Sequence, residues 1–298
     1  MFDLRKHSLR PTIVTAALLL TTAGMLHAQA AGRGNLALGQ PTSASSVEPS
    51  TNNTADLAVD GSMTTRWSSA YNDVDWWQVD LGSEKTVGAV IINWGPPSIP
   101  TRYDVQVSKD GKTFAGAATV TVLFGGAATV VTDAVGESQT MCFQDRLARY
   151  VRIVGTQGAT SKGMSFREVE IRGGDLALGQ PTKASSFANN HSDDLAVDDD
   201  VLGMTDFIAA RGDAGEWWQV DLGSAVMVSV VNVKWTSIYN SAFEIQTSTD
   251  GKSFTTVATG RPVGSNVNRF PERMARYIRI VNSETANAGM SFSIVSVY

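Results

Sequence analysis

A carboxylate, a glycine and several hydroxyl groups lie close together in the segment LAVDGSMTTRWSS, residues 57–69. Asp60 offers carboxylate oxygens, Gly61 permits a sharp turn, and Thr65 offers both a hydroxyl and a carbonyl oxygen. Calcium takes roughly six to eight oxygen ligands at about 2.3–2.6 Å, and such a loop can supply several of them. The loop is not an EF-hand, because the acids at alternate positions are missing. The alternative is an ordinary Asp-Gly turn that binds no metal ion.

The chain repeats its own motifs in the same order. The matching pairs are LALGQPTSASS (36–46) with LALGQPTKASS (176–186), WWQVDLGS at 76–83 and 217–224, YDVQVSKDGKTF (103–114) with FEIQTSTDGKSF (243–254), and ARYVRIV (148–154) with ARYIRIV (275–281). Ordered self-similarity of this kind indicates two copies of one structural unit. After a leader at residues 1–30, we therefore predict one domain over residues 35–172 and a second, diverged domain over residues 175–298.

Both copies show the sequence pattern of β-strands. Tyr103, Val105 and Val107 alternate with polar residues, which is the period of a strand with one buried face. Residues 87–94 are almost continuously apolar, which indicates a strand buried on both faces. Asp110-Gly111 follows the first of these strands and is typical of a turn. The pattern predicts an all-β protein made of sandwich or jelly-roll domains.

These motifs together identify a resemblance. Each copy resembles a coagulation factor 5/8 C-terminal domain, also called a discoidin domain, and is most similar to the bacterial family-32 carbohydrate-binding modules. The matching segments of the first copy are NLALGQPTSASS, LAVDGSMTTRWSS, WWQVDLGS, YDVQVSKDGKTF, ARYVRIVG and FREVEI. The resemblance implies two tandem galactose-binding-like jelly-roll β-sandwiches, each with ligand-binding loops at one end.

The resemblance also implies the remaining calcium ligands of the first domain. Backbone oxygens near Leu57 and Ser62 would join the carboxylate of Glu168 and the carbonyl of Arg167 from the segment FREVEI. Ile294 occupies the position of Glu168 in the second copy, and its side chain has no oxygen. We therefore expect Ca²⁺ in the first domain and none in the second.

A sugar site needs an aromatic face that stacks on the ring and polar groups that bind its hydroxyls. The loops of the first copy offer candidates of both kinds, which are Glu48, Tyr71, Asn72, Asp73 and Trp94. Each has an alternative interpretation: Glu48 as a solvated acid, Tyr71 as an exposed loop aromatic without a function, Asn72 and Asp73 as turn residues, and Trp94 as a residue half in the core. We expect Trp67 in the core.

Two departures from the family pattern leave the ligand open. Gly95 stands where relatives that bind glucosamine or glucan chains often carry an acid, and Gly163 and Met164 stand where an aromatic residue often precedes the last strand. Both departures put cationic sugars in particular in doubt. In the second copy, a different polar site could form from Asn190, His191, Arg211 and Trp235.

The N-terminal segment has the pattern of a secretory signal peptide. A basic start is followed by the apolar run 13–20 and by the small-x-small sequence Ala28-Gln29-Ala30. We expect cleavage near Ala30 and a secreted protein, with no transmembrane segment in the remainder. Without residues 1–30, 21 basic and 28 acidic residues remain, a net charge of −7. This charge argues against a nucleic-acid partner.

The remaining chain is poor in catalytic side chains. His191 and Cys142 are its only histidine and cysteine, which leaves little basis for nucleophilic catalysis. The sequence contains no glycine-rich phosphate loop and no zinc-ligand spacing. We predict a non-catalytic carbohydrate-binding protein; the alternative is an adhesion or interaction module with a protein or, less favoured, a phospholipid partner.

Overall fold

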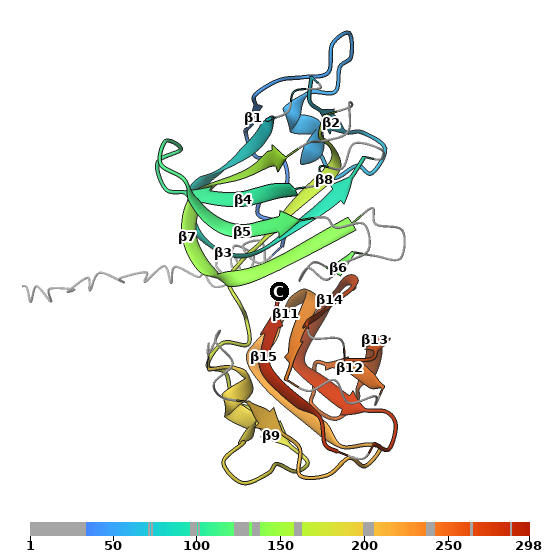
Figure 1. Ribbon diagram of the computed structural model, residues 1–298. Coiled ribbons are helices and arrows are strands. Elements are labelled where there is room, and N and C mark those ends of the chain that lie inside the picture. Colours follow the sequence, from blue (N-terminus) through green and yellow to red (C-terminus); the bar gives the residue numbers. More distant parts are fainter. Residues whose placement is uncertain are drawn as a thin grey trace, which may run out of the picture.

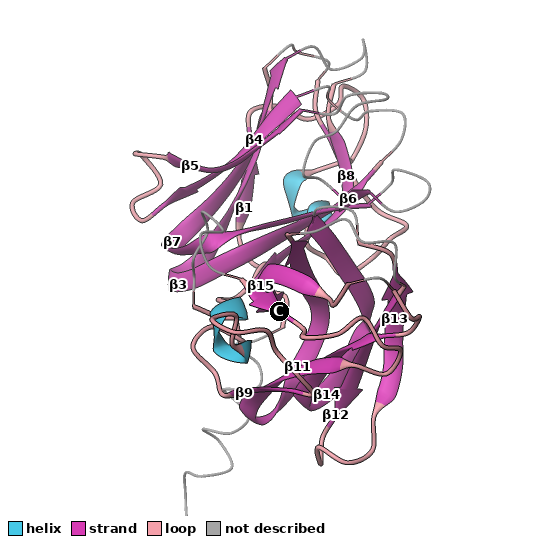
Figure 2. Cartoon of the chain, turned by 60° about the horizontal axis from the view of Figure 1, so that its bottom comes forward, coloured by secondary structure: helices cyan, strands magenta, loops and turns pink. Residues whose placement is uncertain are grey.

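The computed structural model describes residues 34–298 except 71, 73, 96–99, 101, 122–130, 133–137, 158–162, 199–205, 237–241, 263–264 and 287. The expected signal peptide, residues 1–30, lies outside the described residues. Regular structure in the described part consists of strands and two short 3₁₀ turns, η1 (Ala55–Ala58) and η2 (Asp193–Ala196) (Figure 2). Among the described residues, no helix has the length and apolar character needed to cross a membrane.

The first domain is built from eight strands in one continuously hydrogen-bonded sheet of order β2-β8-β3-β7-β4-β5, with β1 on β3 and β6 on β7. Their bounds are β1 Thr42–Ala44, β2 Trp67–Ser68, β3 Trp76–Trp94, β4 Arg102–Ser108, β5 Ala115–Thr121, β6 Val131–Thr132, β7 Ser138–Gln157 and β8 Ser165–Arg172. The pairing of β3 with β7 shifts register between Asp80 and Lys85. Such irregularities bend long strands and let them serve two layers of a sandwich.

The second domain repeats this topology with seven strands. Its bounds are β9 Thr182–Ala184, β10 Phe207–Ile208, β11 Trp217–Trp235, β12 Phe243–Ser248, β13 Thr255–Gly260, β14 Ser265–Asn282 and β15 Ser291–Val297. The order is β10-β15-β11-β14-β12-β13, with β9 on β11. The predicted fold, all-β with two tandem discoidin-like β-sandwiches, is confirmed.

Each sandwich encloses an aromatic core centred on its last strand. In the first domain, Trp67 and Trp77 pack against Phe166 with ring centroids 4.9 and 6.0 Å apart, and Trp67 is fully buried. The prediction that Trp67 belongs to the core is therefore confirmed. Phe207 and Trp218 pack against Phe292 in the same way in the second domain.

A smaller apolar cluster joins the two domains. Ala89 and Ile91 of the first domain pack with Val230 and Tyr298 of the second, and the free Cys142 packs against them. Burial raises the pKa of the Cys142 thiol, which keeps it neutral at physiological pH. The C-terminus accordingly lies between the two domains (Figure 1).

Candidate functional site

The expected calcium loop contacts the last strand of the first domain. Gly61 has a φ of +79°, and its N–H donates to Oε2 of Glu168 at 3.2 Å. The Asp60 carboxylate accepts the N–H of Ser62 at 2.8 Å and the hydroxyl of Thr65 at 2.7 Å. The structure thus brings Glu168 to the loop that holds Asp60, Ser62 and Thr65, although Glu168 lies 107 residues after Gly61 in the sequence.

The two other expected contributors lie on the elements that frame this loop. Leu57 lies in η1, which packs against β8, and Arg167 lies on β8 beside Glu168. Each of these two residues would contribute a backbone oxygen to the ion.

The chemistry of Glu168 fits a bound cation. Its side chain is 6% exposed, and its Oε1 atom has no hydrogen-bond partner among the described residues. Burial, together with repulsion from Asp60 and Glu170, raises the pKa of Glu168 to about 7, against the lowering effect of the Gly61 N–H. A buried carboxylate in this condition lacks a compensating positive charge, which a divalent cation would supply.

The donor set matches a hard cation. The described residues hold no group of three or more His, Cys, Asp or Glu side chains suited to a metal ion. A site here must therefore combine the carboxylates of Asp60 and Glu168 with hydroxyl and carbonyl oxygens, as calcium sites do.

An open route leads to this site. Glu168 and Gly61 border a cleft of about 600 Å³ between the two domains, closed on the other side by Arg269, Phe270 and Pro271. An ion could enter from solvent through this cleft, although Glu168 itself is buried.

The second domain lacks the corresponding carboxylate. Ile294 pairs with Lys234 as Glu168 pairs with Asn93, so the two residues occupy equivalent positions. The loop that would complete a site, residues 199–205, lies outside the described part of the chain.

A buried carboxylate organises the loops at one end of the first domain. Asp75 accepts the hydroxyls of Ser45 and Ser46, both at 2.7 Å, and two N–H groups of Asn72 at 3.2 Å. Burial raises the pKa of Asp75, but the hydrogen bonds from Ser45, Ser46, Asn72 and Ser69 together outweigh it and hold the pKa below its usual value. Asp75 was not among the residues that the sequence indicated, although an acid precedes the tryptophan pair in both copies.

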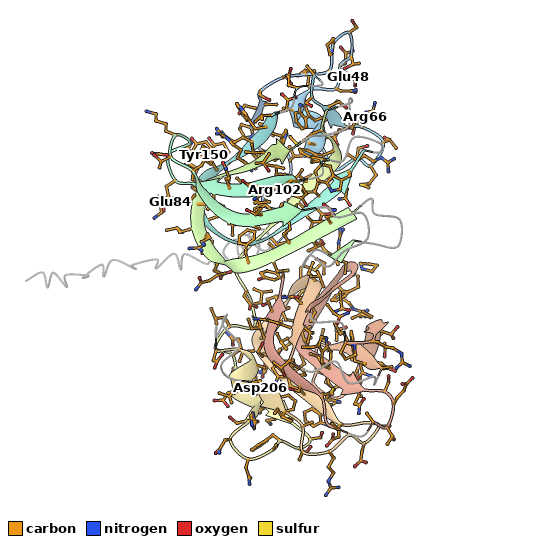
Figure 3. All side chains as sticks on the ribbon, in the orientation of Figure 1. Glu48, Arg66, Glu84, Arg102, Tyr150 and Asp206 are labelled. Carbon is orange, nitrogen blue, oxygen red and sulfur yellow. The ribbon has the colours of Figure 1, made fainter. Side chains whose placement is uncertain are left out.

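Glu48 lies at the same end and is held in place. Its backbone N–H donates to the carbonyl of Ser68 at 2.8 Å, and its carboxylate accepts the amide of Asn53 at 2.8 Å. Arg66 approaches the same carboxylate at 3.9 Å, and the Glu48 side chain keeps 18% exposure (Figure 3). Tyr71 and Asp73, the neighbouring candidates, lie outside the described residues.

The prediction that Trp94 contributes to a sugar platform is wrong. Its side chain is fully buried, and its indole N–H donates to Gln139 at 2.8 Å. The ring packs against Tyr103 and Phe166, each with a centroid distance of 5.1 Å. Trp235 is likewise buried, at 7% exposure, so neither ring can stack on a sugar.

Comparison with known proteins identifies the family. The sequence profile described as F5/8 type C domain matches residues 41–169 and again residues 181–295. The chain belongs to the F5/8 type C domain family. Both of its F5/8 type C domains coincide with the two β-sandwiches described above.

Individual relatives are shorter or longer than this chain. A segment of 59 residues is 41% identical to the polysaccharide lyase 8 family protein HylA of Enterococcus faecalis (strain ATCC 700802 / V583); it is 20% of this chain and only 4% of that protein. Chitosan-binding module 1 of a Paenibacillus sp. IK-5 chitosanase/glucanase is 36% identical, covering 47% of this chain and 98% of the module, with a TM-score of 0.40. Module 2, solved in complex with chitotriose, is 33% identical over 47% of this chain and all of the module, with a TM-score of 0.41.

Proposed function

We propose that this protein is a non-catalytic carbohydrate-binding protein whose first domain holds a saccharide at the loops around Glu48. The observation that carries the proposal is the hydrogen bonding of Asp75, whose single carboxylate fixes Ser45, Ser46 and Asn72 in two separate loops. Loops that are fixed before binding lose little conformational freedom when a ligand arrives.

The fixed loops present groups suited to sugar hydroxyls. The partly exposed carboxylate of Glu48 accepts hydrogen bonds, and the guanidinium of Arg66 beside it donates them. Tyr71, four residues after Trp67 in the sequence, would add the aromatic face that a sugar ring requires. Because two similar modules are described as chitosan-binding, chitotriose is the first probe to test, beside neutral oligosaccharides.

The test is titration calorimetry with a soluble oligosaccharide panel that includes chitotriose. Glu48→Ala is expected to remove the part of the binding heat that belongs to the site in the first domain. Leu147→Ala is the matched control, since Leu147 is 49% exposed on β7 and distant from these loops. Unchanged affinity of Glu48→Ala would place the sugar elsewhere. No binding to any sugar, together with a captured protein ligand, would favour the adhesion alternative.

Calcium is the second part of the proposal. Asp60, Thr65 and Glu168 would hold the ion, with backbone oxygens from Leu57, Ser62 and Arg167 completing the site. The bound ion would neutralise the two carboxylates and tie the loop after η1 to β8. A ligand that binds only the folded state stabilises it by about 2.7 kcal/mol at a hundredfold excess over its Kd.

Thermal unfolding in calcium and in EDTA tests this part. Calcium is expected to raise the melting temperature of the first domain and to have no such effect on Glu168→Gln. Elemental measurement on dialysed protein should find one calcium per chain. Melting that is identical in EDTA, with no calcium found, would refute the site while leaving the sugar proposal standing.

We also propose that residues 1–30 direct export, so that the two domains act outside the cytoplasm. The N-terminal sequence of the exported protein is expected to begin near Ala31; an intact N-terminus on the exported protein would contradict cleavage.

A further inference from the structure

The last strand of the first domain leads from its loop end to the second domain. At the loop end, Ser68 accepts the backbone N–H of Glu48, and its hydroxyl bonds that of Ser165, the first residue of β8. At the other end of β8, Arg172 contacts Glu272 of the second domain at 2.6 Å. The eight residues of β8 therefore separate the loop end from the interface by about 20 Å.

The second domain is arranged in the same way, with its loops at one end of its last strand and the domain interface at the other. The carbonyl of Ile208 accepts the N–H of Ala188, and Ile208 pairs with Ser291, the first residue of β15. At the other end of this strand, Tyr298 packs against Ala89 and Ile91 of the first domain. Each domain therefore contacts its neighbour with the end that lies opposite its loops.

The two loop ends consequently lie at opposite ends of the molecule. Figure 1 shows β1 and β2 in the upper part, β9 in the lower part and the C-terminus between the domains. Glu48 and Asp206, labelled in Figure 3, lie in these two separate parts.

The interface holds this arrangement in place. Within the second domain, Val230 and Tyr298 exchange two backbone hydrogen bonds at 2.9 Å, which fix Tyr298 where it packs against Ala89 and Ile91 of the first domain. Arg269 contacts Glu170 at 3.1 Å, in addition to the contact between Arg172 and Glu272. Buried apolar contact combined with ion pairs opposes free rotation about the short connection between the domains.

The interdomain connection itself is confined. The N–H of Asp175 donates to both carboxylate oxygens of Asp145 at 3.1 Å. A Cβ atom on Gly174 would come within 2.5 Å of the same carboxylate, so the backbone passes directly over it. The connection is therefore a rigid linker and not a flexible one.

The second loop end carries sugar-binding chemistry of its own. Phe187, in the loop between β9 and η2, is 52% exposed and offers an aromatic face. Nearby, the Asp206 carboxylate bonds Nδ1 of His191 at 2.8 Å and the hydroxyl of Thr236 at 3.0 Å, and Arg211 is exposed. An exposed ring beside oriented polar groups is the combination that a pyranose requires.

We propose that one molecule bridges two separate glycan strands, one at each end, and does not bind one strand at two places. This inference rests on the proposed carbohydrate binding and adds its geometry. The two ends face away from each other, so one strand cannot reach both without bending around the molecule. When both ends bind sugar, the molecule therefore cross-links two strands. It does not gain the higher affinity that a tandem module obtains when both of its sites bind the same strand.

Bead bridging tests the proposal. Beads of two colours are coated with the same polysaccharide, in parallel series with chitosan, a neutral glucan and a galactan, and are mixed with the full chain. Mixed-colour clusters are expected on at least one polysaccharide. Clustering should be lost in Glu48→Ala and in Phe187→Ala, while each variant still coats single beads. Leu147→Ala should cluster beads as the unmodified protein does.

The outcomes separate the two proposals. Coating of beads without mixed clusters would overturn bridging and leave carbohydrate binding intact. Clusters that persist in Phe187→Ala would also overturn it, because cross-linking would then arise from self-association through one site. No coating on any polysaccharide would refute the proposed function and bridging together.

Discussion

Replacing Asp175 with asparagine is expected to stabilise the second domain at neutral and alkaline pH. Asp175 begins the second repeat, and its Oδ1 atom accepts the N–H groups of Ala177 at 2.9 Å and Val297 at 2.8 Å. These bonds fasten the start of the domain to its last strand. They require an acceptor oxygen but no charge.

The first domain has the same pair of hydrogen bonds, made by a neutral acceptor. Oδ1 of Asn35 accepts the N–H groups of Ala37 at 3.0 Å and Ile171 at 2.9 Å. Asparagine at position 175 can therefore keep both bonds while removing a buried charge.

The magnitude follows from the pKa of the carboxyl group. Burial raises the pKa of Asp175 from 3.8 to about 6, against the hydrogen bonds from Val297 and Ala177, and Asp145 adds repulsion. The folded domain keeps a proton that the unfolded chain releases, so stability falls as the pH rises from 3.8 to about 6. Two pKa units correspond to a loss of about 3 kcal/mol.

Urea unfolding followed by tryptophan fluorescence at pH 4 and pH 8 measures this loss. Asp175→Asn should match the unmodified protein at pH 4 and exceed it by about 3 kcal/mol at pH 8. The reciprocal variant Asn35→Asp should make the first domain lose stability as the pH rises. The reasoning is refuted if Asp175→Asn is less stable at pH 8, or if the difference between the two proteins does not change with pH.

Three further substitutions test other contacts. Trp94→Ala should lower the free energy of unfolding, measured in urea, by about 3–5 kcal/mol because of the cavity it leaves. The sugar affinity of the folded protein should stay unchanged; a loss of affinity without a loss of stability would show that Trp94 contacts the sugar after all. Gly88→Ala places a Cβ 2.7 Å from the ring of Tyr298, so the domains should separate, seen as an increased radius of gyration in X-ray scattering; an unchanged radius would contradict this. Asp75→Ala should weaken sugar binding by about 1–3 kcal/mol in calorimetry, because Ser45 and Ser46 lose the carboxylate that they share, and unchanged affinity would argue against loop organisation by Asp75.

The fold could be predicted because it depends on patterns that survive in one sequence. The ordered repeats indicated two domains, and alternation along residues 103–107 marked a strand whose Tyr103, Val105 and Val107 are indeed buried. The continuous apolar run 87–94 indicated burial on both faces, and every residue in it is buried. That same pattern should have placed Trp94 in the core, since a residue inside such a run has no free face.

The candidate site could be predicted only where its residues carry a recognisable motif. Asp60 and Glu168 were matched through the family resemblance, and the structure places both beside Gly61. Asp75 and Phe187 were missed because their significance depends on which loops meet in space. The interface was missed for the same reason: nothing in the sequence indicates that Tyr298 packs against the first domain.

The strand β8 connects the two halves of the proposed function. Glu168, Glu170 and Arg172 are spaced two residues apart, so they share one face of the strand. Glu168 belongs to the proposed calcium site, while Glu170 and Arg172 contact Arg269 and Glu272 of the second domain. A calcium ion at Glu168 would fix the strand that carries the domain contacts, and would remove the repulsion between Glu168 and Glu170. Metal binding in the first domain would therefore support the fixed orientation on which the proposed bridging depends.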